Sequence, residues 1–164
     1  MAIDVYLQIE GIKGESQDDK HKDWIEASGV RWSIFQPRSA SASTAGGHTA
    51  ERVEMSDISF TKMADLSTPI LAQYCAMGKT IPKAVFEFMR ADGDGKPICY
   101  FRIELKNVII ASVAPSIEGG HILHESIGLK FAEVVYKYTQ QKIGGGAGGN
   151  TAGGWNLAAN KVAS

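Results

Sequence analysis

The chain has 164 residues, of which 44% are hydrophobic, so it is long enough for one domain with a sizeable core. Its 17 Lys and Arg residues nearly balance 18 Asp and Glu residues, and a net charge of −1 gives no electrostatic reason to expect nucleic acid or an anionic membrane as a partner. No segment approaches the roughly 18 consecutive apolar residues that would span a membrane. The N-terminus lacks the basic start and continuous apolar run of a signal peptide, so we expect a protein made and folded in the cytosol.

The first part of the chain predicts short strands separated by a polar loop. Residues 2–9 alternate apolar and polar side chains, which is typical of a half-buried strand. Residues 11–23 are charged and contain two glycines, so they predict a loop, and residues 24–27 predict a short strand. A further strand is expected over residues 29–36 and ends at Pro37, which cannot donate a ladder hydrogen bond.

Alternation within residues 29–36 assigns the two faces of this strand. The side chains expected to face the core are Val30, Trp32 and Ile34. Arg31 and Ser33 share the opposite parity and are expected to face away from the core, towards solvent or a partner.

Residues 37–49, PRSASASTAGGHT, are small, polar and glycine-rich. They carry too little apolar surface to offset the entropy of ordering them. A loop of this length within a compact domain is usually either functional or disordered. Because its backbone groups are little obstructed by side chains, such a segment can pair with the strand edge of a partner.

A strand is expected again over residues 50–62, with a β-bulge or bend at Ser56 or Asp57, where the apolar parity changes. The stretch 60–78 then contains the only convincing helix. Ser67 or Thr68 is expected to cap it, Pro69 suits the first helical position, and Gly78 suits a left-handed end. Its apolar stripe consists of Ile70, Leu71, Tyr74, Cys75 and Met77.

The second half of the chain also predicts strands. Residues 83–90 and 98–107 form a hairpin around a turn, and 108–113 continue the second arm. Residues 122–139 are β-like, with a parity change near Ala132 that predicts a second bulge. The glycine-rich composition of residues 142–154 predicts a flexible linker to a C-terminal segment anchored by Trp155. These elements together predict a mainly β fold, a small β-barrel of two sheets with one short flanking α-helix, in a single domain over residues 1–164.

The sequence offers no convincing catalytic, metal or cofactor site. The run from Asp92 to Gly95 resembles the start of a calcium loop but lacks the later ligands, and a hairpin turn is the better interpretation. His48, His121 and His124 are expected to be solvated, and no G-x-S-x-G motif or phosphate-binding glycine loop is present. We therefore expect no enzyme and no cofactor. The two cysteines, Cys75 and Cys99, are expected to be reduced core thiols.

Three blocks in order resemble the haemolysin-coregulated protein (Hcp) family, the tube component of type VI secretion systems. They are MAIDVYLQIEGIKGES with DDKHKDWIEASGVRWS, then VEMSDISFTKMADLSTPIL, which is the most specific block, and finally GGWNLAANKV. The resemblance covers nearly the whole chain, and no effector extension is expected after Ser164. The family's structural residues correspond here to Trp32, Phe60, Thr61, Lys62, Ser67, Thr68, Pro69, Trp155 and Asn156.

The resemblance implies a phage tail-tube-like barrel that forms hexameric rings. These rings stack into a tube inside a contractile sheath, the protein is itself secreted from the bacterial cytoplasm, and effectors can be carried in the ring lumen. The implied partners are further copies of the chain together with sheath, spike and effector proteins. Arg31 and Ser33 are then expected to face the lumen. The loop over residues 37–49 is expected to contact other subunits or rings through Arg38, Ser39, Ser41, Gly46, Gly47 and His48. The residues alone equally allow a monomeric barrel that binds a small ligand in its mouth.

Overall fold

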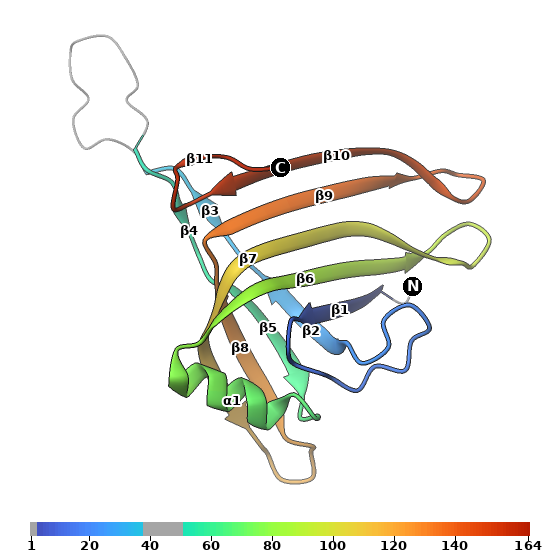
Figure 1. The fold of residues 1–164 in the computed structure, drawn as a ribbon. Coiled ribbons are helices and arrows are strands. Elements are labelled where there is room, and N and C mark those ends of the chain that lie inside the picture. Colours follow the sequence, from blue (N-terminus) through green and yellow to red (C-terminus); the bar gives the residue numbers. More distant parts are fainter. Residues whose placement is uncertain (1–2, 38–50) are drawn as a thin grey trace, which may run out of the picture.

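In the computed structural model, which describes residues 3–37 and 51–164, the alternating segments form strands and the stretch after Ser67 forms a helix (Figure 1). The elements in chain order are β1 (Ile3–Ile9), β2 (Ile25–Arg31), β3 (Ile34–Phe35), β4 (Glu54–Met55), β5 (Ile58–Met63), α1 (Thr68–Met77), β6 (Thr80–Ala91), β7 (Pro97–Ser116), β8 (His124–Lys130), β9 (Glu133–Gln141), β10 (Ala147–Asn156) and β11 (Lys161–Val162).

Six of these strands close a barrel. The main sheet has the order β11-β10-β9-β7-β6-β1-β2-β5-β8, and β8 also pairs with β7, so β7, β6, β1, β2, β5 and β8 form a closed circle. The 20-residue strand β7 pairs with β6 and β9 in its first part and with β8 in its second part. It therefore joins the barrel to the extension formed by β9, β10 and β11 (Figure 1). The prediction of a mainly β barrel with one short flanking helix is confirmed.

The strand register places apolar residues in rows that fill the barrel. Leu7 pairs with Ile25 on one side and with Phe86 on the other, and Phe86 pairs with Ile103. All four side chains are fully buried. From the opposite wall, the ring of Phe60 meets the ring of Phe86 edge-on, with centroids 5.6 Å apart. Alternation along the strands thus directs one side of the wall into a packed core.

The helix begins and ends close to the predicted residues, but its start is stabilised differently. Pro69 lies in the first turn, and Gly78 has the left-handed φ of 64° that ends the helix. The Ser67 side chain forms no capping hydrogen bond. Its hydroxyl instead donates to the carboxylate of Asp65, and the Thr68 hydroxyl accepts the backbone N–H of Asp65 at 3.0 Å. Ser67 is therefore the N-cap residue, as predicted, but the expected side-chain capping hydrogen bond does not form, because the Ser67 hydroxyl donates to Asp65 instead.

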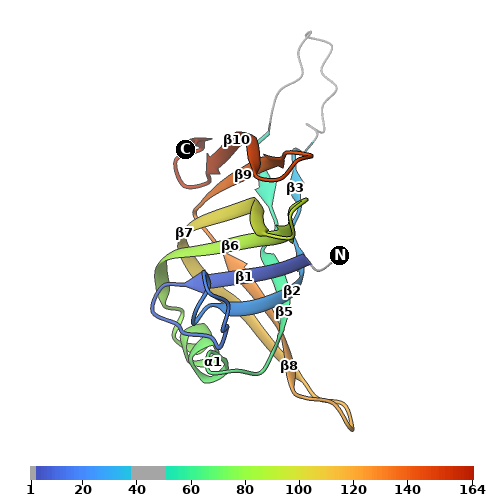
Figure 2. The ribbon, with the colours of Figure 1, turned by 90° about the vertical axis from the view of Figure 1, so that its right-hand side faces the viewer.

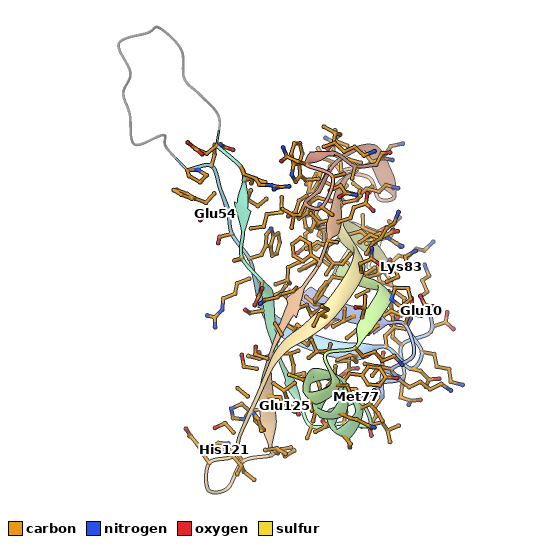
Figure 3. All side chains as sticks on the ribbon, turned by 60° about the vertical axis from the view of Figure 1, so that its left-hand side comes forward. Glu10, Glu54, Met77, Lys83, His121 and Glu125 are labelled. Atoms are coloured by element: carbon orange, nitrogen blue, oxygen red, sulfur yellow. The ribbon has the colours of Figure 1, made fainter. Side chains whose placement is uncertain are left out.

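The apolar stripe of the helix is narrower than its sequence indicates. Leu71 is the one helix residue that is buried, and it belongs to the main core. Ile70, Tyr74 and Cys75 are half-buried against that core. Met77 is 61% exposed and points away from the barrel (Figure 3). The helix therefore docks mainly through its first two turns.

The prediction of a flexible linker over residues 142–154 is wrong for most of this segment, because residues 147–156 form strand β10. This strand pairs antiparallel with β9, from Ala147 opposite Gln141 to Asn156 opposite Glu133. A Cβ on Gly154 would lie 2.5 Å from the carbonyl oxygen of Val134, so only glycine lets the strands approach this closely. Ladder hydrogen bonds need no side chains, and composition alone therefore suggested flexibility where a strand forms.

Strands β3 and β4 leave the barrel as a separate two-stranded sheet (Figures 1 and 2). The parity change predicted at Ser56 or Asp57 is the bend between β4 and β5, where the chain passes from this small sheet into the barrel. The change near Ala132 is the break between β8 and β9, not a bulge. Because β3 lies outside the barrel, Ile34 is 52% exposed, and its predicted place in the core is wrong.

Candidate functional site

A buried charged cluster lies at the centre of the most specific sequence block. The ammonium group of Lys62 on β5 lies 2.6 Å from Glu125 Oε2 and 2.9 Å from Asp65 Oδ1, and the Lys62 and Glu125 side chains are at most 1% exposed. Lys62 also donates to Thr68 Oγ1 at 3.1 Å, and Thr68 donates to Glu125 at 3.0 Å. One buried cation therefore joins two carboxylates and the first residue of α1.

This cluster explains the spacing of the motif residues. Lys62 and Glu125 are directly opposite each other on β5 and β8, with their side chains on the inner side of the sheet. The turn at Asp65 brings Ser67 and Thr68 back over them. Because a buried charge is stable only when it is paired and hydrogen-bonded, the cluster fixes α1 against β5 and β8 (Figure 3 labels Glu125).

The outer side of the same strands carries small hydroxyl side chains. Ser28, Thr61 and Ser126 lie opposite one another on β2, β5 and β8. The Ser28 and Thr61 hydroxyl oxygens are 2.9 Å apart, and Thr61 also donates to the backbone oxygen of Ser28 at 3.2 Å. In a neighbouring row Arg31 lies opposite Ser59. We call the outward face of β2, β5 and β8 the hydroxyl face.

Of the two residues predicted to face a lumen, Arg31 lies on this outer side, and Ser33 follows after the end of β2. Arg31 and Ser33 are both exposed, whereas Trp32 between them is half-buried and packs on the core. The Trp32 ring stacks on those of Phe101 and Tyr136, with centroids 6.0 and 6.2 Å apart. The Ser33 backbone N–H donates to Ser56 Oγ at 2.7 Å, which fixes the chain where β2 leaves the barrel.

The C-terminal motif residues lie in the extension outside the barrel. Trp155 on β10 is opposite Val134 on β9 and Val162 on β11. Asn156 closes the turn that follows, because its Oδ1 accepts the backbone N–H of Ala159 at 2.8 Å. The two residues therefore connect the last three strands. The predicted loop contacts Arg38, Ser39, Ser41, Gly46, Gly47 and His48 lie outside the described residues.

The structure adds a second buried polar cluster that sequence reasoning missed. His21, in the charged loop before β2, is 1% exposed and stacks on Tyr6 with ring centroids 4.2 Å apart. Its Nδ1 lies 2.5 Å from Asp18 Oδ2 and its Nε2 lies 2.9 Å from Glu87 Oε1. Glu87 also accepts from Arg102 at 3.1 Å. The loop is thereby held on the outside of β1 and β6.

We expect the contact between Asp18 and His21 to make the fold sensitive to acid. The hydrogen bond from His21 lowers the pKa of the Asp18 carboxyl, so this contact stabilises the protein above the unfolded carboxyl pKa of about 3.9 and is lost as the pH falls. The variant Asp18→Asn should unfold at a lower temperature than the parent at pH 6, by an amount corresponding to about 1 kcal/mol. The melting temperatures of the two proteins, compared from pH 6 into the acid range, should converge as the Asp18 carboxyl becomes protonated below its lowered pKa. A constant difference across this range would contradict the prediction.

The run that begins at Asp92, which the sequence analysis rejected as a calcium loop, forms a turn in the structure. Asp92 begins the predicted hairpin turn between β6 and β7, where its carboxylate accepts backbone N–H groups from Asp94, Lys96 and Gly146. The hydrogen bond from the Lys96 backbone is the main cause of the lowered pKa of the Asp92 carboxyl.

Cys75 and Cys99 are free and half-buried, and burial raises the pKa of the Cys99 thiol. Within residues 3–37 and 51–164, no helix has both the length and the apolar character needed to cross a membrane.

Comparison with known proteins identifies the family. A family model described as "Type VI secretion system effector, Hcp" matches residues 6–138. The chain is 38% identical over 162 residues to Protein hcp1 of Pseudomonas aeruginosa, covering 98% of both chains. Its structure is similar to that of Hcp1 from Salmonella typhimurium, with a TM-score of 0.79, 34% identity and coverage of 99% of this chain and 100% of the other. It is also similar to a structure titled "Structure of a type six secretion system protein", with a TM-score of 0.88, 29% identity and the same coverage. The chain therefore belongs to the Hcp family of type VI secretion proteins.

Proposed function

We propose that this chain is a structural subunit of the inner tube of a type VI secretion system. In this proposal residues 1–164 form a single tube domain, hexameric rings stack into the tube, the protein leaves the cytoplasm through the system itself, and effectors can travel in the lumen. The family membership places the chain in the type VI machinery. The observation that carries the finer proposal is the hydroxyl face, where Ser28, Thr61 and Ser126 form a row across β2, β5 and β8 on the outer side of a packed core.

A wall of this chemistry suits a channel for varied cargo. Serine and threonine hydroxyls can donate or accept hydrogen bonds, and their short side chains present no large apolar surface to which cargo would adhere. Arg31 adds one cation to the row that contains Ser59. Arg31 and Ser33 are therefore proposed to line the lumen.

The alternative is a monomeric barrel that binds a small ligand. The packed rows around Leu7, Phe60 and Phe86 argue against a ligand in the barrel interior, because these side chains fill the space between its walls. Solution mass separates the two hypotheses, since a monomer has 17.6 kDa and a hexamer has six times that mass.

We expect multi-angle light scattering at micromolar concentration to give the hexameric mass. A ring needs two different patches on each subunit, and each stable interface should bury more than about 1,000 Å². A mass of 17.6 kDa across the micromolar range would contradict the proposed function.

The lumen assignment predicts a selective effect at Ser33. Replacing Ser33 with glutamate should leave the ring mass unchanged, because this side chain is exposed and only its backbone N–H contacts Ser56. Retention of co-expressed effectors in pull-downs should fall at least several-fold, since six charges would enter the lumen. The matched control is Thr151→Glu, because Thr151 is an exposed hydroxyl residue on β10, in the extension outside the hydroxyl face. Equal retention by the parent and Ser33→Glu for every effector tested would count against the assignment.

The remaining partners stay proposals based on the family. The loop over residues 37–49 is proposed to contact a neighbouring subunit or ring, through weak contacts that gain strength by repetition around the ring. Sheath and spike proteins are the other proposed partners.

A further inference from the structure

A single histidine holds the loop between β1 and β2 against the outside of the barrel. We call residues 15–22 of this loop the outer loop (Figures 1 and 2). His21 is 1% exposed, and its ring stacks on Tyr6 of β1 with ring centroids 4.2 Å apart. Over the part of the chain that the structure describes, the contact between His21 Nε2 and Glu87 Oε1 is the only hydrogen bond from the outer loop to a strand. The attachment of the outer loop to β1 and β6 therefore depends on this ring.

Both nitrogens of the His21 ring face carboxylate oxygens. Nδ1 lies 2.5 Å from Asp18 Oδ2, and Nε2 lies 2.9 Å from Glu87 Oε1. An ionised carboxylate only accepts hydrogen bonds, and a neutral imidazole carries a proton on just one of its two nitrogens. In a neutral ring, the lone pair of one nitrogen would therefore face an anionic oxygen at close range. This geometry fits a ring with a proton on each nitrogen and a positive charge.

The surroundings keep both carboxylates ionised. Arg102 Nη1 on β7 donates to Glu87 Oε2 at 3.1 Å, so the second oxygen of this carboxylate also faces a cation. The Asp18 carboxylate accepts the backbone N–H of Lys20 at 3.3 Å. The hydrogen bond from His21 is the main cause of the lowered pKa of the Asp18 carboxyl. Because a cation or a hydrogen-bond donor favours the ionised form of each carboxyl group, neither carboxyl supplies the proton in place of the ring.

The charged side chains around His21 form a row across the outer side of β6 and β7 in which the sign of the charge alternates. In order, they are Asp18, His21, Glu87, Arg102, Glu104 and Lys83. Beneath the ring, the pKa of the Tyr6 hydroxyl is raised, chiefly by burial and further by Asp18, Asp4 and Glu26. The Tyr6 ring and the Trp24 ring, which meets His21 edge-on at 4.7 Å, therefore bring no charge near neutral pH. The alternation is complete only when His21 is a cation.

We propose that His21 is a pH-sensitive latch: its doubly protonated ring holds the outer loop on β1 and β6, and loss of one proton releases the loop. The attached loop binds this proton between two anions, whereas a released loop exposes the ring to water, where a histidine loses its proton near pH 6.5 to about 7. Proton binding and attachment therefore favour each other. The attachment is present at lower pH, while the carboxylates are ionised, and it is lost as the pH rises.

This direction is opposite to the loss of the Asp18 contact in acid, which requires protonation of the carboxyl. The outer loop is therefore attached only in a window of pH that ends in acid at Asp18 and in base at His21. Its release uncovers the Tyr6 ring and the Glu87 carboxylate on the barrel wall. The latch lies within one chain, so it goes beyond the proposed function and does not depend on assembly.

Hydrogen exchange of the full parent chain, followed by mass spectrometry, tests the release directly. From about pH 6 to about pH 9, the protection of the outer-loop amides should fall at least several-fold after correction for the intrinsic pH dependence of exchange. Residues 101–106 of β7 are the internal reference, because β6 and β9 pair with them on both sides, and their protection should not change. Unchanged protection of the outer loop across this range would overturn the inference.

Two replacements of His21 separate its charge from the space that its ring fills. In His21→Gln one neutral amide cannot donate to both carboxylates from opposite sides, so the outer loop should exchange rapidly already at about pH 6, without a further step at higher pH. In His21→Arg the guanidinium group stays charged, donates in several directions and can stack on Tyr6, so protection should persist to about pH 9.

The matched control is His121→Gln, which removes an exposed histidine from the connection between β7 and β8. This variant should show the same pH-dependent step in outer-loop exchange as the parent. A step that disappears in His121→Gln, or one that persists unchanged in His21→Gln, would overturn the inference.

Discussion

Replacing Lys62 with methionine is expected to lower the free energy of unfolding by about 3–5 kcal/mol. Methionine fills a similar volume but removes the cation that lies 2.6 Å from Glu125 and 2.9 Å from Asp65. Two carboxylates would then remain near each other without a positive partner, one of them fully buried. Urea unfolding at equal protein concentration measures the loss, with the concentration held constant because assembly contributes to stability.

Two further variants test whether the loss of stability comes from disrupting the charged cluster or from removing a lysine in general. Lys83→Met removes a partly exposed cation that lies 3.2 Å from Glu104, and this change should stay within about 1 kcal/mol. The double variant Lys62→Met/Glu125→Gln should lose less stability than the two single variants added together, because the neutral amide no longer needs the ammonium group. Additive losses would mean that Lys62 and Glu125 are not energetically coupled.

Truncating Leu71 to alanine is expected to cost about 2–5 kcal/mol, through lost burial and the cavity left behind. Leu71 is the only fully buried side chain of α1, so it carries most of the docking of a helix too short to be stable alone. Thermal melting at matched concentration gives the measurement. Met77→Ala on the same helix is the control, since Met77 is largely exposed and its truncation should change stability by less than about 0.5 kcal/mol. A negligible loss at Leu71 would show that the helix does not stabilise the barrel.

The sequence predicted those features that depend on local patterns. Apolar and polar residues alternate along residues 2–9 and 98–107 because one side of each strand packs on the core. The sequence therefore predicted both the strands and the side chains that face the core, without knowledge of the neighbouring strands. Gly78 marked the end of the helix because its left-handed φ is a local requirement. The resemblance pointed to Lys62, Ser67 and Thr68 as structural residues, but not to the charged cluster that they form.

The features that were missed depend on residues distant in the chain. His21 belongs to a loop of ordinary charged composition, and its role depends on Glu87, which lies 66 residues later. Residues 147–156 became a strand because β9 supplies hydrogen-bond partners along their whole length. Ile34 carried the parity of a core residue, yet the chain had already left the barrel at that point. Neither composition nor periodicity within a short window contains this information.

The long strand β7 has a consequence for how the protein opens. It is hydrogen-bonded to β6, β8 and β9, so it takes part in both the barrel and the outer extension. Detaching β7 would break all three ladders together, and no neighbouring strand could retain its full set of partners. Apart from the outer loop, local opening should therefore be confined to the connection between β7 and β8 at residues 117–123, the turn at Asp92 and β11, while the amide protons of residues 101–106 exchange with solvent only when the whole domain unfolds. The barrel and its extension then behave as one cooperative unit, although the extension lies outside the closed circle of strands.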